Sequence, residues 1–165
     1  KRVREMLAEH PELATVSATW IETPIEAAAQ LANREIADML LAQGAPLEIC
    51  TAAALGMSDK VDEMLKANPQ LSKATGAHGI SVMYFPVVGG YKDIAEILLA
   101  HGADVNAGAG GTTPLHGAVM FNNAELAQWL LSHGADPSLM NYDGKTPIQM
   151  AQEEGKNEVA KMLGA

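Results

Sequence analysis

Residues 111–119 read GTTPLHGAV, and this stretch decides the fold. Thr113 stands directly before Pro114, and a threonine hydroxyl can accept a hydrogen bond from the free amide groups at a helix start. Proline at the first helical position gives up no hydrogen bond, because that amide has no partner within the helix. The leucine, alanine and valine that follow can bury one helix face. The stretch therefore predicts a helix start, and it raises the question whether His116 belongs to a scaffold or to a site.

Related stretches recur along the whole chain. Helical segments like "IAEILLAHGAD" start at Val3, Ile36, Val61, Ile94, Leu126 and Val159, at a nearly constant interval that is broken by one short step. A second set of related segments, upstream of the last five of these, starts at Thr23, Glu48, Ser81, Thr113 and Thr146. A fixed period of this kind predicts stacked units, each too small to bury its faces alone.

A period of about 33 residues with Thr-Pro-Leu-His at the start of a unit resembles the ankyrin repeat. The resemblance covers essentially the whole chain and is most specific over residues 112–151. It implies an all-α solenoid of helix–turn–helix–hairpin units in a single domain, residues 1–165. The hairpin loop that connects one unit to the next is called a finger here. The expected divisions are a half repeat with its finger at 1–22, a short repeat at 23–47, repeats at 48–80, 81–112 and 113–145, and a C-terminal capping repeat at 146–165.

Within this resemblance, His116 is interpreted as a scaffold residue that hydrogen-bonds backbone near the turn and braces adjacent units. The corresponding positions in the other units are mostly polar, as a recurring structural role requires and a catalytic role does not: Glu26, Thr51, Tyr84 and Gln149. We expect His101 and His133 to cap the last turns of their helices rather than bind a metal. Cys50 falls at the leucine position of the motif, which predicts a small buried group.

Two departures from the pattern predict local differences. The step from Ile36 to Val61 is the short one, and it leaves no room for a hairpin finger between the first two full units. Pro86 falls at the fifth residue of an expected helix, where proline removes a hydrogen bond and clashes with the preceding turn. We expect that helix to be kinked, to be shortened or to begin late. The distortion either serves a pocket or is tolerated because neighbouring units hold it.

Charge and composition narrow the classes of partner. The net charge is −9, and residues 74–155 contain eight acidic residues against only Lys92 and Lys145, which gives −6. An acidic surface repels nucleic-acid phosphates and anionic membranes, and attracts a protein with a basic patch. No apolar run reaches the roughly 18 residues of a membrane span. The N-terminus lacks the apolar core of a signal peptide, and a single cysteine fits a reducing compartment, so we expect a cytoplasmic location.

No catalytic, cofactor-binding or metal-binding motif is found, so we expect a non-catalytic module that binds another protein on its concave and finger face. The ankyrin resemblance places the contact positions around the finger turns and at the ends of the first helix of each unit. The expected contact residues are Trp20, Glu22, Leu31, His78, Ile80, Val88, Met120, Phe121, Tyr142, Asp143 and Lys145. For Trp20 and Phe121, packing between units is an equal alternative, whereas Trp129 falls in a core position.

Two other functions stay open. The sequence begins inside a helical pattern, which fits a regulatory ankyrin domain within a larger protein. A small-molecule or enzymatic site around Tyr84, Pro86 and Tyr91 is the less favoured alternative.

Overall fold

The computed structural model describes residues 2–16, 22–108 and 110–164, and within these ranges the chain is all-α, as predicted. The only strand-like pairing found there is an isolated antiparallel bridge between Thr75 and Ser81. The α-helices are α1 (Arg2–Glu9), α2 (Pro24–Gln30), α3 (Arg34–Ala42), α4 (Ile49–Ala54), α5 (Ser58–Ala67), α6 (Phe85–Gly89), α7 (Lys92–Ala100), α8 (Pro114–Met120), α9 (Ala124–Ser132), α10 (Pro147–Glu153) and α11 (Asn157–Met162). Short 3-10 helices are η1 (Pro11–Ala14), η2 (Pro69–Lys73), η3 (Ala77–Gly79) and η4 (Val82–Tyr84).

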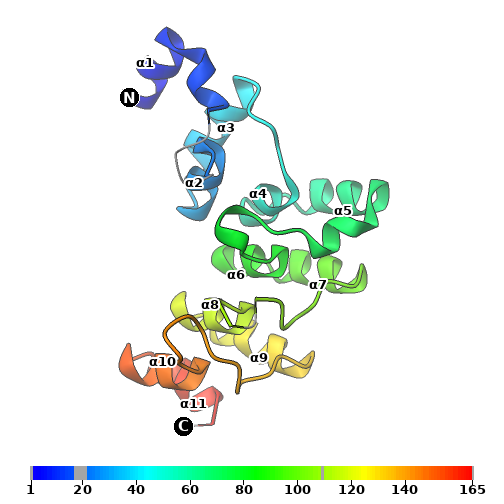
Figure 1. Ribbon diagram of the computed structural model, residues 1–165, viewed down its shortest axis with the longest axis vertical. Coiled ribbons are helices and arrows are strands. Elements are labelled where there is room, and N and C mark those ends of the chain that lie inside the picture. Colours follow the sequence, from blue (N-terminus) through cyan, green and yellow to red (C-terminus); the bar gives the residue numbers. More distant parts are fainter. Residues whose placement is uncertain (1, 17–21, 109, 165) are drawn as a thin grey trace.

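The helices form five pairs, here called units one to five: α2/α3, α4/α5, α6/α7, α8/α9 and α10/α11. The first helices contact one another in the order α2, α4, α6, α8 and α10, and among the second helices α5 contacts α7 and α9 contacts α11. Figure 1 shows the result as an elongated, curved stack, with α4, α6, α8 and α10 toward the inside of the curve and α5, α7 and α9 toward the outside. The chain termini lie at opposite ends.

Helix starts follow the chemistry of the Thr-Pro motif. Thr23, Thr113 and Thr146 each occupy the N-cap, accept a hydrogen bond from the backbone amide three residues on, and precede a proline in the first turn. Glu26 and Gln149 return a bond to the N-cap amide, which completes two capping boxes. The motif therefore fixes where the first helices of units one, four and five begin.

The interior of the molecule is a layer shared between units. Large side chains that are fully buried come from successive helices, among them Ile25, Leu65, Ile94, Leu98, Leu115 and Leu130. Trp129 is buried in the same cluster, which confirms the packing role predicted from its alignment. Since these residues meet across unit boundaries, removing a unit would expose the apolar faces of its neighbours.

Both predicted departures are present. Residues 43–48 connect α3 directly to α4. In unit three, η4 occupies the start of the expected helix, and α6 begins only at Phe85, so that Pro86 lies in its first turn. The helix begins late because proline is tolerated in a first turn and excluded from a helix interior.

One turn departs from the regular period. Gly79, Gly111 and Gly144 occupy corresponding positions of three fingers, and Gly79 (φ 71°) and Gly144 (φ 69°) have the left-handed conformation. Gly111 does not, because the finger before unit four is one residue shorter and turns earlier, at Gly108 and Gly110. A positive φ is costly for residues with a Cβ, so the turn falls where this glycine-rich segment permits it.

Candidate partner-binding surface

His116 answers the opening question, because its ring is buried and braces two units. Its Nε2 lies 3.0 Å from the Lys145 carbonyl oxygen, and its Nδ1 lies 2.8 Å from the Thr113 hydroxyl. Nε2 must donate to the Lys145 carbonyl, and in the neutral ring that burial favours, Nδ1 accepts the Thr113 hydroxyl proton. Burial lowers the pKa of His116, against the opposing effect of the Lys145 bond. Both ring nitrogens are occupied, so His116 is a scaffold residue.

Four apolar side chains remain exposed in three parts of the stack: Leu31 in unit one, Met120 and Phe121 in unit four, and Tyr142 in the finger before unit five. Together they are called the apolar patch here. Their exposed fractions are 80%, 45%, 43% and 73%. Leu31 and Phe121 cap the C-termini of α2 and α8, and Met120 is the last residue of α8. Tyr142 lies in the finger before unit five. Exposed aromatic residues and methionine are enriched at protein interfaces, and these four were all expected contact residues.

The end of α8, which carries Met120, is supported by the neighbouring unit. Tyr84 packs so closely on Gly117 of α8 that a Cβ there would lie 2.6 Å from its ring. Its hydroxyl lies 3.6 Å from the Met120 sulfur and donates to it. Burial raises the pKa of Tyr84, so the group stays a donor. The contact orders the end of α8 where the patch is exposed.

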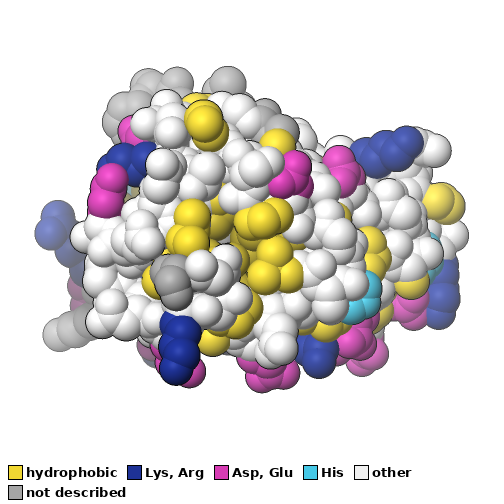
Figure 2. Space-filling model, turned by 90° about the horizontal axis from the view of Figure 1, so that it is seen from below, with side chains coloured by type: hydrophobic (Ala, Val, Ile, Leu, Met, Phe, Trp, Pro, Cys, Tyr) yellow, Lys and Arg dark blue, Asp and Glu magenta, His cyan; other side chains and the backbone are white. Residues whose placement is uncertain are grey.

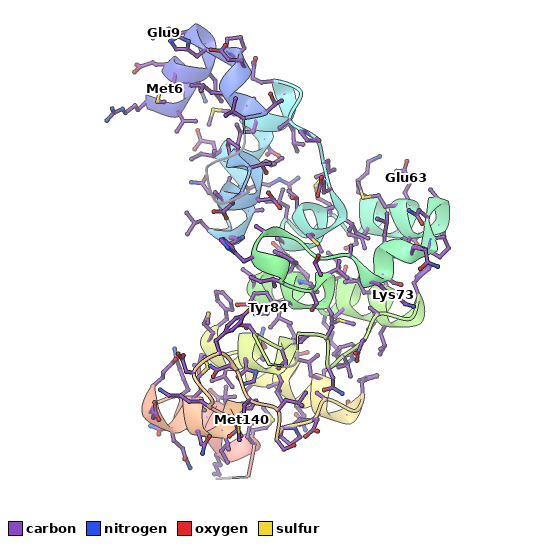
Figure 3. All side chains as sticks on the ribbon, viewed as in Figure 1. Met6, Glu9, Glu63, Lys73, Tyr84 and Met140 are labelled. Atoms are coloured by element: carbon purple, nitrogen blue, oxygen red, sulfur yellow. The ribbon has the colours of Figure 1, made fainter. Side chains whose placement is uncertain are left out.

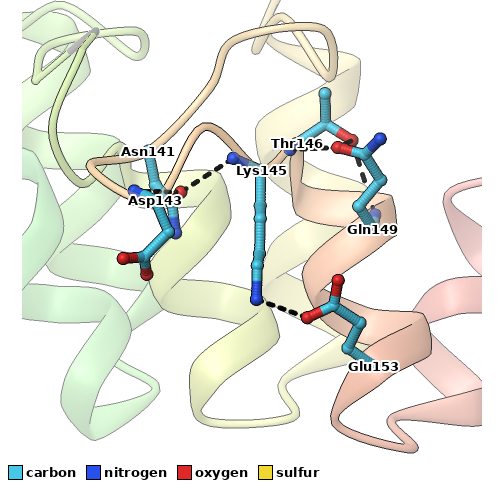
Figure 4. A network of polar contacts seen from close by, with 6 residues as sticks. All are labelled: Asn141, Asp143, Lys145, Thr146, Gln149 and Glu153. Atoms are coloured by element: carbon cyan, nitrogen blue, oxygen red, sulfur yellow. Dashed lines mark hydrogen bonds and ion pairs between the residues drawn. The ribbon is translucent and has the colours of Figure 1, made fainter.

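The finger before unit five is held in place by hydrogen bonds within the turn and by an ion pair to α10 (Figure 4). The Asn141 side chain accepts hydrogen bonds from the amides of Asp143 and Lys145, both at 3.0 Å. The Lys145 ammonium pairs with Glu153 at the end of α10. Tyr142 projects beside this turn onto the previous finger, where a Cβ at Gly111 would lie 2.7 Å from its hydroxyl oxygen. The finger therefore presents Tyr142 and Asp143 on a rigid turn.

The remaining expected contact residues lie elsewhere on the stack. Glu22 is half-buried at the start of unit one, His78 is exposed in the finger before unit three, and Val88 is half-buried in α6. Ile80, also an expected contact residue, is half-buried and packs on the core. The finger is pinned by the bond from the Gly76 amide to the Ile80 carbonyl, which turns the side chain of Ile80 inward. Trp20 lies outside the described residues.

The end of the stack near unit five combines apolar and acidic surface. Figure 2, which views the molecule from below, shows hydrophobic side chains gathered at the centre of this face, with acidic and basic side chains around its edge. The acidic residues exposed in the last finger and unit five are Asp143, Glu153, Glu154 and Glu158. An apolar centre with a charged rim is the usual composition of a protein-binding surface.

Two features were missed in the sequence. Met140 is 54% exposed directly before the last finger turn, and an apolar residue next to Asn141 was the available signal. At the other end, a cavity of about 490 Å³ opens between α1, α2 and α3, lined mainly by apolar residues that include Val3, Met6, Leu13 and Ile36. No residue pattern marks it, because its walls come from three helices.

Side chains that could take part in metal binding or catalysis do not gather at one site in the described part of the chain. No group of three or more His, Cys, Asp or Glu side chains able to hold a metal occurs within the described ranges. Cys50 is buried, and burial followed by the charges of Glu48 and Glu26 raises its pKa to about 12. Tyr84 and Pro86 are packed into the interior. Among the described helices, none has the length and hydropathy to cross a membrane.

Comparison with known proteins places this geometry in a family. The family profile described as ankyrin repeats (3 copies) matches residues 47–141 and 111–164. The chain belongs to the ankyrin-repeat family, as the sequence resemblance predicted. Proteins of this family, and the kinase inhibitors among its relatives described next, are typically non-catalytic protein-interaction modules.

Two kinds of curated relative are similar to this chain. It is 31% identical over 130 residues to cyclin-dependent kinase 4 inhibitor B of Rattus norvegicus, across 76% of this chain and 97% of that protein. The human protein of the same name is 32% identical over 119 residues, across 70% of this chain and 83% of that protein. This chain is also 35% identical over 144 residues to human BCL-6 corepressor-like protein 1. The similar segment covers 87% of this chain but only 8% of that protein.

Proposed function

We propose that this chain is a non-catalytic module that binds another protein on its concave and finger face, with the apolar patch as the anchor. The observation that carries the proposal is the support beneath the end of α8. Tyr84 of the adjacent unit packs on Gly117 of α8 and donates a hydrogen bond to the Met120 sulfur, while Met120 and Phe121 stay exposed. Side chains already ordered before binding lose less conformational entropy when a partner arrives.

Charge indicates the chemistry of the partner. Three members of the patch, Met120, Phe121 and Tyr142, lie in the part of the chain that carries −6, and Asp143, Glu153 and Glu154 are exposed in the last finger and unit five. A partner with a basic segment around one or two apolar anchors would complement this surface. Nucleic acid is not expected, because its phosphates would meet carboxylates. Opposite charges speed association and are screened by salt, so we expect binding to weaken between about 0.05 and 0.5 M salt.

The test is affinity capture from the native cell lysate with two variants. The variant Met120→Ala, Phe121→Ala, Tyr142→Ala removes three members of the patch, and hot-spot truncations cost about 2 kcal/mol or more each. A control variant, Met6→Ala, Val16→Ala, removes exposed apolar groups at the opposite end of the stack. We expect the first variant to lose a partner that the wild type and the control both retain. Equal capture by all three would contradict the proposal.

A cyclin-dependent kinase is the partner class to test first. This class is named by the rat relative, which this chain spans over 97% of its length. Purified cyclin-dependent kinase 4 would be titrated with the wild type and with the patch variant. Saturable binding that the patch variant loses would support a kinase partner, and absence of binding would leave the lysate capture to define another.

The alternative of a regulatory domain within a larger protein is supported by the match to BCL-6 corepressor-like protein 1, where the similar segment is 8% of the whole. The full-length gene sequence separates the two cases: a long additional domain favours the tethered form. In either case we propose a cytoplasmic site of action, consistent with a lone buried thiol.

A further inference from the structure

A second cavity, of about 330 Å³, lies between the fingers that precede units three and four and is distinct from the apolar patch. It is called the interfinger cavity here, and its polar lining includes Lys73, Thr75, Ser81, Gly102 and Asp104. Figure 3 shows Lys73 on the side of the stack away from Tyr84, the residue that supports the patch. Its size falls in the range of small-molecule sites.

The next interface along the stack shows what normally fills this position. There Asn106 spans two consecutive loops: its side-chain amide nitrogen donates to the Gly134 carbonyl at 3.0 Å, and its amide oxygen accepts from the Asp136 backbone at 2.8 Å. One carboxamide thus supplies a donor and an acceptor to neighbouring backbone groups of the following unit.

The repeat places Lys73 where Asn106 stands one unit later, and Gly102 and Asp104 where Gly134 and Asp136 stand. An ammonium group has no acceptor and cannot replace the amide. Among the described residues, no hydrogen bond reaches the Gly102 carbonyl or the Asp104 amide, and Lys73 makes no ion pair. The cavity opens where the carboxamide bridge is missing.

Ser81 adds an independent sign of a missing ligand. Its hydroxyl oxygen is buried and has no hydrogen-bond partner within the part of the chain that the structure describes, and the residue, only 6% exposed, belongs to the cavity wall. The counterpart Thr113 uses its hydroxyl on the His116 ring, but unit three has Tyr84 at that position. An unsatisfied buried hydroxyl is costly, so a ligand that bonds to it is favoured.

We propose that the interfinger cavity binds a carboxamide, whose N–H donates to the Gly102 carbonyl and whose oxygen accepts from the Asp104 amide, with Ser81 as a third contact. The carboxamide comes either from a small free molecule or from a glutamine or asparagine side chain of a bound protein. Both supply the same group, and the proposal does not depend on the function of the apolar patch.

The test is a ¹H–¹⁵N NMR titration with propionamide and with propionate, two probes of the same size. We expect propionamide to shift the Asp104 and Ser81 amide signals saturably, and propionate to bind at least about tenfold more weakly, because it lacks the donor for Gly102. Equal or tighter binding of propionate would overturn the proposal, since Lys73 would then be an anion site. Absence of a saturable shift with propionamide would overturn it as well.

Two variants at Lys73 distinguish the effect of the missing carboxamide from the effect of the lysine charge. Lys73→Asn places the chain's own carboxamide where Asn106 stands in the next unit, so we expect it to abolish propionamide binding and raise the urea midpoint. Lys73→Met removes the charge without supplying the amide and should bind as the wild type does. Loss of binding in Lys73→Met would overturn the proposal, as would unchanged binding in a folded Lys73→Asn.

Ser81→Ala gives a second measurement that does not depend on how Lys73→Asn folds. It should weaken propionamide binding several-fold, and an unchanged affinity would contradict the assigned contact. Free glutamine compared with a blocked Gly-Gln-Gly peptide then distinguishes the source. Tighter binding of glutamine indicates a free small molecule, and tighter binding of the peptide indicates a side chain of a partner.

Discussion

The His116 side chain connects the start of α8 to the finger of the next unit, because its ring contacts both the Thr113 hydroxyl and the Lys145 carbonyl. The ankyrin resemblance implied the bond to backbone near the turn, and the mostly polar residues at the corresponding positions of the other units agreed with a structural role. The motif did not predict the interfinger cavity, because Lys73 looks like an ordinary exposed lysine until Asn106 is seen to span the next pair of loops. A residue's role is hard to predict from a single sequence when that role depends on a contact with the neighbouring unit.

Stability should depend on pH through His116. The folded state lowers its pKa below the usual 6.5, so the unfolded chain binds more protons as pH falls through that value. The free energy of unfolding should therefore decrease as the pH falls below about 6.5, by at most about 1.4 kcal/mol per pH unit. His116→Gln, which copies Gln149 at the same position of unit five, should lose this part of the slope in urea unfolding followed by circular dichroism. An unchanged slope in the variant would assign the effect to other groups.

Cys50 should report opening of the stack. Its pKa of about 12, against an ordinary value of 9.0, leaves on the order of a thousandfold less thiolate at pH 8 than in the unfolded chain. We expect an aromatic disulfide reagent to modify native Cys50 at least that much more slowly than the chain in urea. The labelling midpoint should coincide with the loss of helix signal. Fast labelling of the native protein would show that unit two is open in solution.

At the scale of elements, helices were predicted well where a cap and a periodic apolar face agree, as in α8 and α9. Unit three was harder, because Pro86 allowed a kinked, a shortened or a late helix. The choice was made by packing: Phe85 inserts against Gly76 of the preceding finger, where a Cβ would lie 2.7 Å from the ring. This contact joins residues that no local pattern relates.

Replacing Pro86 tests whether α6 is strained. In a helix interior, removal of a proline would stabilise the protein by about 3 kcal/mol. Here Pro86 lies in the first turn and loses no hydrogen bond, so we expect Pro86→Ala to change the free energy of unfolding by less than about 1 kcal/mol. Urea unfolding measures the change. A gain of about 3 kcal/mol, the cost of an interior proline, would show that the late start of α6 is imposed against the helix preference.

At the scale of the whole molecule, the stack is held by apolar contact between first helices and by a few polar bonds between units. Ser58 bonds to Asp93 between units two and three, and Asn106 bonds to the loop of unit four. Between units one and two the finger is missing, and the side chain of Arg34 donates to the Leu55 carbonyl at 2.9 Å. The regular period of the sequence predicted the stack, and its one short step predicted the missing finger at this joint.

The joint between units one and two should therefore open before the rest of the stack. In a linear array, stability is approximately a sum over units and their interfaces, so a weak interface lets the terminal part unfold alone. Arg34→Ala removes the bond to Leu55, and a lost bond to a charged group costs about 1.5–3 kcal/mol. Because Arg34 is exposed and also pairs with Asp38, we expect the lower end of that range or less.

Hydrogen exchange measures this opening: in Arg34→Ala it should become faster in α2 and α3 and stay unchanged in α7 to α9. Lys66→Ala, which removes an ion pair within α5, is the matched control and should leave α2 and α3 protected. Equal loss of protection along all units in Arg34→Ala would mean that the stack unfolds as one cooperative body, and that the short step creates no separate joint.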